Sequence, residues 1–218
     1  MLANEHFASR GTFVRDAAGG VVVRRGPNVE VLPQFWGAGL NLTVAHQVTE
    51  ESVLASVKRV WTSPFTERAY LWRKQILEEQ GDVFPSVLVQ QTVPSAKSGV
   101  LITSGLQEGD ADDLTVVTAE GVGGAVEGED AETLLLRPDG GVRLLSQTKA
   151  PRRREVVTGG TRWVAAGRPD VLLADGEIAQ LRSVVSALRA RDAGTPDADT
   201  VWDIEFGFLE GRLWLFQI

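Results

Sequence analysis

Cysteine is absent from this sequence, and histidine occurs only twice. Without cysteine the chain can have no disulfide, no thiolate zinc site and no thiol nucleophile, which fits a reducing compartment. His6 and His46 lie far apart and lack the spacing of a metal site, so each is expected at the surface or in a loop. Any metal in this protein would therefore be held by oxygen ligands.

The sequence also has no excess of positive charge and no long apolar run. It contains 29 acidic and 22 basic residues, for a formal net charge of -7, which predicts no general attraction to nucleic acid. No segment is apolar enough to span a bilayer, and the first ten residues lack the apolar stretch of a signal peptide. We therefore expect a cytoplasmic protein that binds a small ligand or a protein partner, and neither nucleic acid nor membrane.

The composition that is present is that of a globular protein. The chain has 218 residues, of which 43% are hydrophobic and 23% are charged, enough to bury a sizeable core. No repeat of fixed period is visible. One domain, or two small lobes, is expected over residues 1–218.

Two helices are predicted in the first half of the chain, between segments of sheet. Thr49 and Thr66 are suitable N-caps, and together they predict a helical pair over about residues 49–80. The first helix has apolar residues at helical spacing, namely Val53, Val57, Val60 and Trp61. Before the pair, two short valine-rich strands are expected at Thr12–Arg15 and Gly20–Arg25, followed by a loop from Gly26 to Leu42.

Most of the remaining chain has the pattern of short strands. The predicted strands are Val87–Val93, Gly99–Thr103, Leu114–Ala119, Glu132–Arg137 and Val142–Leu145. Residues Pro138 to Gly141 predict a hairpin turn, and Arg152–Arg154 is expected in a solvated loop. A third helix is expected over Glu177–Arg191. The fold class is therefore α+β, with a mixed or antiparallel sheet and packed helices.

The last segment, Val201–Ile218, predicts a hairpin that carries Asp203, Glu205 and Gln217. Gly211 favours a three-residue loop, which pairs Asp203 with Gln217. The three polar side chains then share one face of the sheet. The other face is expected to hold Trp202, Ile204, Phe206, Trp214 and Phe216.

Two carboxylates and an amide oxygen on one sheet face are suitable ligands for a hard cation such as Mg²⁺. Nucleotide phosphates commonly supply further ligands to such an ion. The alternative is an ordinary solvated polar face, because strands of an antiparallel sheet usually have one wet side.

Several motifs occur in the same order as in a known family. Residues 23–33, VRRGPNVEVLP, resemble V-R-S-S-A-N-x-E-D-L-P, and residues 35–40 continue as a glycine-bearing loop. Residues 58–70, KRVWTSPFTERAY, resemble the family's helical pair, and residues 87–103 its V-x-V-Q…S-G-V-x-x-T strands. Residues 119–128 resemble A-x-x-G-L-G-E, and residues 203–217 resemble D-I-E-W-G…G-x-L-x-x-L-Q. The chain thus resembles the ATP-binding part of phosphoenolpyruvate synthase and pyruvate phosphate dikinase.

The resemblance implies an ATP-grasp fold, in which ATP lies between two lobes. It also implies that a phosphoryl group passes to a histidine on a separate swivelling domain. That domain, and a domain that binds pyruvate or phosphoenolpyruvate, would act in cis or in trans. Catalysis by this part would consist of positioning and charge neutralisation.

The resemblance also implies roles for individual residues. Arg24 matches the arginine that contacts the transferring phosphates, where a guanidinium offers several fixed donors. Gln90 matches the glutamine near the adenine, although Gln91 is an equally available neighbour. The remaining matches are Gly121 and Gly123 in the phosphate loop, Asp203 at the nucleotide, and Glu205 and Gln217 at Mg²⁺. The alternatives are a surface strand residue for Arg24 and an ordinary turn for the glycines.

The sequence departs from the family pattern where phosphates would bind. Arg25, Gly26 and Pro27 replace the S-S-A run, which removes two hydroxyls and one backbone donor. Val31 replaces an aspartate, and Gly124 stands where the family has glutamate. None of the 23 residues before Arg24 is lysine, although the family has a phosphate-binding lysine upstream of this motif. We therefore expect an incomplete nucleotide clamp.

Three functions follow from these matches and departures. The first is the Mg-ATP-binding portion of a dikinase-type phosphotransferase, active once the missing segments are supplied. The second is a degenerate, non-catalytic nucleotide-binding or interaction module. The third is a domain similar to glucan water dikinase, with a carbohydrate as acceptor, because the N-V-E and G-A-G-L motifs also fit that group. Acceptor binding lies in other domains, so the sequence does not choose among acceptors.

Overall fold

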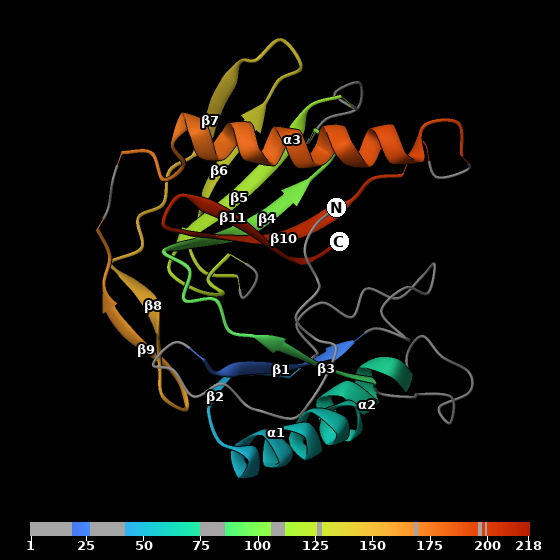
Figure 1. Ribbon diagram of the computed structural model, residues 1–218, viewed down its shortest axis with the longest axis vertical. Helices are drawn as coiled ribbons and strands as arrows, with labels where there is room; N and C mark the ends of the chain where they lie inside the picture. Colours follow the sequence, from blue (N-terminus) through green and yellow to red (C-terminus); the bar gives the residue numbers. More distant parts are fainter. Residues whose placement is uncertain are drawn as a thin grey trace. The chain divides into compact units, whose positions relative to one another are not determined.

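The computed structural model describes residues 19–26, 42–74, 86–105, 112–125, 128–167, 170–195, 198 and 200–218. Figure 1 shows the chain, which divides into two compact units. Unit 1 comprises Met1–Thr92 and Val157–Thr161, and unit 2 comprises Val93–Val156 and Arg162–Ile218.

The elements follow one another in this order: β1 (Val21–Gly26), β2 (Thr43–Gln47), α1 (Glu50–Thr62), η1 (Ser63–Phe65), α2 (Glu67–Lys74), β3 (Ser86–Gln91), β4 (Lys97–Ile102), β5 (Leu114–Glu120), β6 (Glu132–Leu136), β7 (Val142–Ser146), β8 (Arg152–Val157), β9 (Gly160–Ala165), α3 (Asp175–Asp192), β10 (Asp203–Leu209) and β11 (Arg212–Gln217).

Unit 1 is built on a three-stranded antiparallel sheet with the order β2-β1-β3. Helix α1 begins at Thr49, whose side chain accepts a hydrogen bond from the Ser52 N–H in a capping box. The small core joins sheet and helix through Val23, Val44, Val53 and Val60. The predicted helical pair is confirmed for α1 and for α2 as far as Lys74.

Unit 2 is built on a six-stranded antiparallel sheet with the order β11-β10-β4-β5-β6-β7. Helix α3 runs across one face of this sheet, as Figure 1 shows. Its residues Ile178, Leu181, Val185 and Leu188 join the buried side chains of the strands in one core. At about 1.5–3 kcal/mol for each large apolar side chain, this burial is the main stabilising contribution in the unit.

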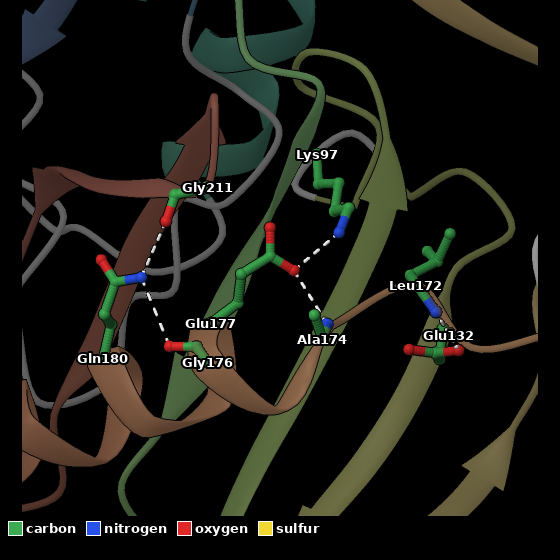
Figure 2. A network of polar contacts seen from close by, with 8 residues as sticks. All are labelled: Lys97, Glu132, Leu172, Ala174, Gly176, Glu177, Gln180 and Gly211. Carbon is green, nitrogen blue, oxygen red and sulfur yellow. Dashed lines mark hydrogen bonds and ion pairs between the residues drawn. The ribbon is translucent and has the colours of Figure 1, made fainter.

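Polar contacts fasten the ends of the sheet to α3 (Figure 2). The buried Glu177 accepts a hydrogen bond from Lys97 Nζ at 2.6 Å and one from the Ala174 N–H at 2.9 Å. Gln180 donates to the Gly211 carbonyl oxygen at 2.8 Å, in the turn of the last hairpin. These contacts pair the buried polar groups and fix α3 along the strands.

The α+β class and the largely antiparallel strands are confirmed, but three local predictions are wrong. Arg152–Arg154 lies in strand β8, which pairs with β9, and not in a loop. His46 is 3% exposed, because its ring packs against Gly20, where any side chain would overlap it. Trp61 is 55% exposed and lies outside the core stripe of α1.

Three predictions fall on other parts of the chain. The strand expected at Thr12–Arg15, the loop expected between Gly26 and Leu42, and the residues of the helical pair beyond Lys74 lie outside the described residues. Among the described residues, no helix is long and apolar enough to cross a membrane.

Glu132 on β6 is only 1% exposed, and its Oε2 accepts a hydrogen bond from the Leu172 N–H at 2.9 Å (Figure 2). Burial raises the pKa of Glu132, although hydrogen bonds from Leu172 and Leu173 and the charge of Lys97 act in the opposite direction. The carboxyl group of Glu132 therefore binds its proton more tightly in the folded state than in the unfolded state. Ionisation of this group lowers the free energy of unfolding.

We predict that Glu132→Gln gains stability relative to wild type as the pH rises. The difference in the free energy of unfolding should increase from about pH 4.5, the ordinary value, through the raised pKa, and then level off. Urea unfolding at several pH values measures it, with the exposed Glu210→Gln as the control. A difference that stays constant with pH would contradict the raised pKa.

Candidate functional site

The hairpin of β10 and β11 closes through a two-residue turn. Leu209 pairs with Arg212, and the residues between them, Glu210 and Gly211, have φ angles of 53° and 74°. Positive φ at both positions is typical of a type I′ turn, which matches the right-handed twist of the strands. The predicted three-residue loop, with Asp203 opposite Gln217, is therefore wrong.

A β-bulge nevertheless places Gln217 beside the carboxylates. Phe206 pairs with Leu215, but the next pair joins Glu205 to Gln217, so Phe216 is an extra residue in β11. Directly paired residues share a face, and alternate residues along a strand do too. Asp203, Glu205 and Gln217 thus share one face of the sheet, as expected, although the register differs from the predicted one.

The same register corrects the prediction for two aromatic residues. Trp214 pairs with Gly207, two residues from Glu205, so it lies on the carboxylate face. Phe216 also lies there, because a side chain at Gly207 would meet its ring. The residues of β11 that pack on the α3 core are Leu213 and Leu215 instead.

The floor of the carboxylate face is made of small and apolar side chains. Across β4, Glu205 pairs with Val100 and Asp203 with Ile102, and Val100 in turn pairs with Val117 on β5. These three apolar side chains are half-buried. The face therefore combines oxygen ligands at one edge with an apolar surface beside them, which is suitable for a ligand with charged and uncharged parts.

The electrostatics of this face favour a cation. Partial burial raises the pKa of Asp203, and the negative charge of Glu205 raises it further. A divalent cation would relieve this repulsion, and carboxylate and amide oxygens are the donors that Mg²⁺ takes. In the described part of the chain, no group of three His, Cys, Asp or Glu residues that could hold a metal is found.

The glycine loop after β5 attaches to the same face. Ser98 pairs with Gly207, which puts its side chain on the carboxylate face, and its Oγ accepts a hydrogen bond from the Gly123 N–H at 3.0 Å. Gly121 and Gly123 have φ angles of 80° and 76°, which glycine adopts without strain. The fold thus brings Gly123 and the carboxylates to one side of the sheet.

The backbone donors of this loop are already used inside unit 2. The Gly121 N–H donates to the Ala96 carbonyl oxygen at 2.7 Å, and the Val122 N–H donates to that of Arg154 at 3.2 Å. Glu129 occupies the space beside Gly124 and pairs with Arg154 at 2.6 Å. A phosphate would reach these amides only after they exchange partners.

The other predicted site residues lie in unit 1. Val22 pairs with Gln90, and Arg24 pairs with Leu88, so Arg24 and Gln90 share a face of the three-stranded sheet. Val23 and Val89, which alternate with them, pack on the α1 core. Arg24 and Gln90 therefore lie on the face that points away from α1.

Sequence reasoning missed Ser98 and the Phe216 bulge. Ser98 belongs to the serine-glycine-valine motif that was matched to a strand, but only the register shows that its hydroxyl holds the glycine loop. The bulge has no signal in the sequence, because an extra residue in a strand of alternating pattern looks the same as a longer turn.

We predict that Gly121→Ala destabilises the protein more than Gly194→Ala does. Both glycines have positive φ, 80° and 78°, which costs alanine about 1–2 kcal/mol. At Gly121 the new methyl group would also overlap the Arg154 carbonyl oxygen, whereas nothing lies within 4 Å at Gly194. Chemical unfolding should give a loss at Gly121 about 1–3 kcal/mol larger. Equal losses would show that β8 does not approach the loop this closely.

The chain matches the family described as pyruvate phosphate dikinase, AMP/ATP-binding domain, over residues 5–218. A probable phosphoenolpyruvate synthase of Archaeoglobus fulgidus is 42% identical over 84 residues, which are 38% of this chain and 11% of that protein. A rifampicin phosphotransferase of Streptomyces sp. is 34% identical over 145 residues, covering 64% of this chain and 16% of that protein. A probable phosphoenolpyruvate synthase of Methanothermobacter thermautotrophicus is 29% identical over 203 residues, covering 90% of this chain and 29% of that protein.

The match to the family thus extends over almost the whole chain, whereas the chain spans only 11% to 29% of the length of these relatives. The matched residues include both elements of the site described above, the glycine loop and the last hairpin. The chain belongs to the family of pyruvate phosphate dikinase AMP/ATP-binding domains.

Proposed function

We propose that this chain is the Mg-ATP-binding portion of a phosphotransferase similar to phosphoenolpyruvate synthase and pyruvate phosphate dikinase. A phosphoryl group would pass from ATP to a histidine on a separate domain. The observation that carries the proposal is the shared face of Asp203, Glu205 and Gln217, opposite the core of unit 2.

On this face the three residues would have different roles in binding. Glu205 and Gln217 are directly paired across β10 and β11, so their oxygens suit a single Mg²⁺, and Asp203 would bind the nucleotide beside it. Bound Mg²⁺ supplies neutralisation of phosphate charge. The apolar floor of Val100 and Val117 would exclude water from the uncharged part of the nucleotide.

Arg24 and Gln90 of unit 1 complete the proposal. The guanidinium of Arg24 would contact the transferring phosphates, and the amide of Gln90 would lie near the adenine. Their common face supports these roles, since the other face of the strands is used by the α1 core. The proposal also includes an ATP-grasp fold for residues 1–218. It further includes a cytoplasmic location and no nucleic-acid partner.

The final phosphoryl acceptor is left open by the relatives. Some are named phosphoenolpyruvate synthase and others rifampicin phosphotransferase, so the chain is similar to parts of proteins that are named for different reactions. The domain that binds pyruvate or phosphoenolpyruvate, or another acceptor such as the carbohydrate of a glucan water dikinase, would be supplied in cis or in trans.

A degenerate, non-catalytic module is the second candidate. The observation that favours it is the internal use of the loop donors, because the N–H groups of Gly121, Val122 and Gly123 are all hydrogen-bonded within unit 2. The altered residues Arg25, Gly26 and Pro27 also remove groups that the family uses near phosphates. Such a module would keep the fold but hold ATP weakly or not at all.

We predict that Glu205→Gln and Asp203→Asn each weaken Mg-ATP binding, on the order of 10- to 100-fold. Both variants replace a carboxylate by an amide of the same shape, so the loss reports charge and metal ligation. Calorimetric titration with ATP, in the presence and absence of Mg²⁺, measures it. Glu210→Gln is the matched control, because it removes an exposed carboxylate from the same hairpin and should leave binding unchanged.

The titration separates the two candidates. Saturable binding that requires Mg²⁺ and both carboxylates supports the phosphotransferase portion. No heat from a folded wild-type chain would favour the degenerate module, and equal loss in Glu210→Gln would show a general effect of charge.

We predict that Arg24→Gln slows phosphoryl transfer more than it weakens ATP binding. An arginine that contacts the transferring phosphates stabilises charge that develops in the transition state, and its loss should lower the rate by about 100-fold or more. Label from radioactive ATP on a histidine domain of a relative, added in trans, gives the rate. The exposed Arg68→Gln is the control, and an unchanged rate in Arg24→Gln would remove Arg24 from the mechanism.

A further inference from the structure

A compact polar cluster holds the C-terminal end of α3 against the start of β10. Asp192, the last residue of α3, is 6% exposed and accepts hydrogen bonds from Arg191 Nε at 2.6 Å and Arg191 Nη2 at 3.0 Å. Its Oδ2 also accepts a hydrogen bond from Trp202 Nε1 at 3.1 Å. The Arg191 guanidinium in turn lies 5.1 Å from the centre of the Trp202 ring. The three side chains therefore fix one another.

The backbone of Trp202 is held as firmly as its ring. Its N–H donates to Thr103 Oγ1 at 2.7 Å, and its carbonyl oxygen accepts a hydrogen bond from the Thr103 N–H at 3.0 Å. Thr103 directly follows β4. Trp202 is thus tied to α3 through its indole and to the end of β4 through both backbone groups.

Asp203, the next residue, is paired with a neighbouring strand on one side only. The pairs between β10 and β11 begin at Glu205, so the strand partner of Asp203 is Ile102 on β4 alone. The ring of Trp202 packs against the core that α3 covers. Because neighbouring side chains in a strand point to opposite faces, fixing the Trp202 ring on the core side turns Asp203 toward the carboxylate face.

We propose that Asp192 is a positioning residue for the nucleotide site, acting through Trp202 to hold Asp203 on the carboxylate face. The inference rests on the proposed function, since it assigns a role in Mg-ATP binding. Both oxygens of Asp192 are engaged by Arg191 and Trp202, so it acts on the site without touching the ligand. A site whose ligands must be held closely depends on such supporting contacts.

The test compares Asp192→Ala, Asp192→Asn and Trp202→Phe by calorimetric titration with ATP, with and without Mg²⁺. Asp192→Ala and Trp202→Phe should each weaken Mg-ATP binding about 10-fold, since each removes the hydrogen bond between Asp192 and the indole. Asp192→Asn keeps an acceptor oxygen for the indole N–H and should restore most of the affinity. Binding of ATP without Mg²⁺ should weaken as well in Asp192→Ala and Trp202→Phe, because Asp203 is the residue assigned to the nucleotide and not to the metal ion.

The control is Glu155→Ala, which breaks another arginine–carboxylate pair of unit 2, at 2.9 Å to Arg162, away from Trp202. A merely structural role for Asp192 would lower the thermal midpoint without changing the affinity of the folded protein, and that result would overturn the inference. Trp202→Phe, which keeps an aromatic ring at this position but lacks the indole N–H, tests the same hydrogen bond if Asp192→Ala does not fold.

The outcomes separate this inference from the function on which it rests. Wild-type protein without Mg-dependent ATP binding would overturn the proposed function, and the positioning role with it. Wild-type binding that is unchanged in Asp192→Ala and Trp202→Phe would overturn the positioning role alone.

Discussion

The alternation of side chains along β10 is the constraint on which both the core and the candidate site depend. Ile204, Phe206 and Phe208 are almost fully buried on the α3 side, and the two phenylalanine rings meet edge to face at 5.7 Å. A slip of one residue would expose these three side chains and push Asp203 and Glu205 into the core. Because burial of each large side chain is worth about 1.5–3 kcal/mol, the core itself selects the face on which the carboxylates lie.

Helix α3 also holds the turns at the ends of the strands through hydrogen bonds. Gln180 contacts the last turn and the start of β11, where it donates to the Gly211 carbonyl oxygen and accepts from the Leu213 N–H. Arg182 donates to the carbonyl oxygens of Arg137 and Gly141 around the turn between β6 and β7. The helix that covers the core face therefore also fixes two hairpins, and the opposite face is left as a platform on rigid elements, where ligand groups keep their geometry.

The parts of the fold that depend on local chemistry could be predicted from the sequence. The Thr49 cap, the turn at Asp139 to Gly141 and the alternation in β10 each reflect interactions among residues close in the chain. The prediction failed where distant partners decide. Strand β8 carries three consecutive arginines and has the composition of a loop, yet Arg154 pairs with Glu129 at 2.6 Å, and its carbonyl oxygen accepts a hydrogen bond from the Val122 N–H.

In the candidate site too, some features could be predicted from the sequence and others could not. Alternation alone put Asp203 and Glu205 on one face, but Gln217 joins them through a bulge that the sequence does not reveal. The predicted three-residue loop failed because Glu210 adopts positive φ beside Gly211, so Leu209 stays in the strand and the turn is one residue shorter. The resemblance to a family predicted which residues belong to the site, whereas the strand register shows which residues lie beside them. One of these neighbours, Ser98, was not predicted.

This separation of faces also bears on the residues by which the chain departs from the family pattern. Gly124, which stands where the pattern has glutamate, is not among the residues of the core that α3 covers. The loop around Gly121 has instead satisfied its donors with Ala96 and Arg154, which removes the penalty of leaving them unpaired. At Asp203, partial burial and then the charge of Glu205 raise the pKa, so this carboxyl group is not stabilised as an anion by its surroundings. In the proposed function a cation bound on this face would offset the repulsion between Asp203 and Glu205, and the α3 core would hold both carboxylates on the platform that the ion needs.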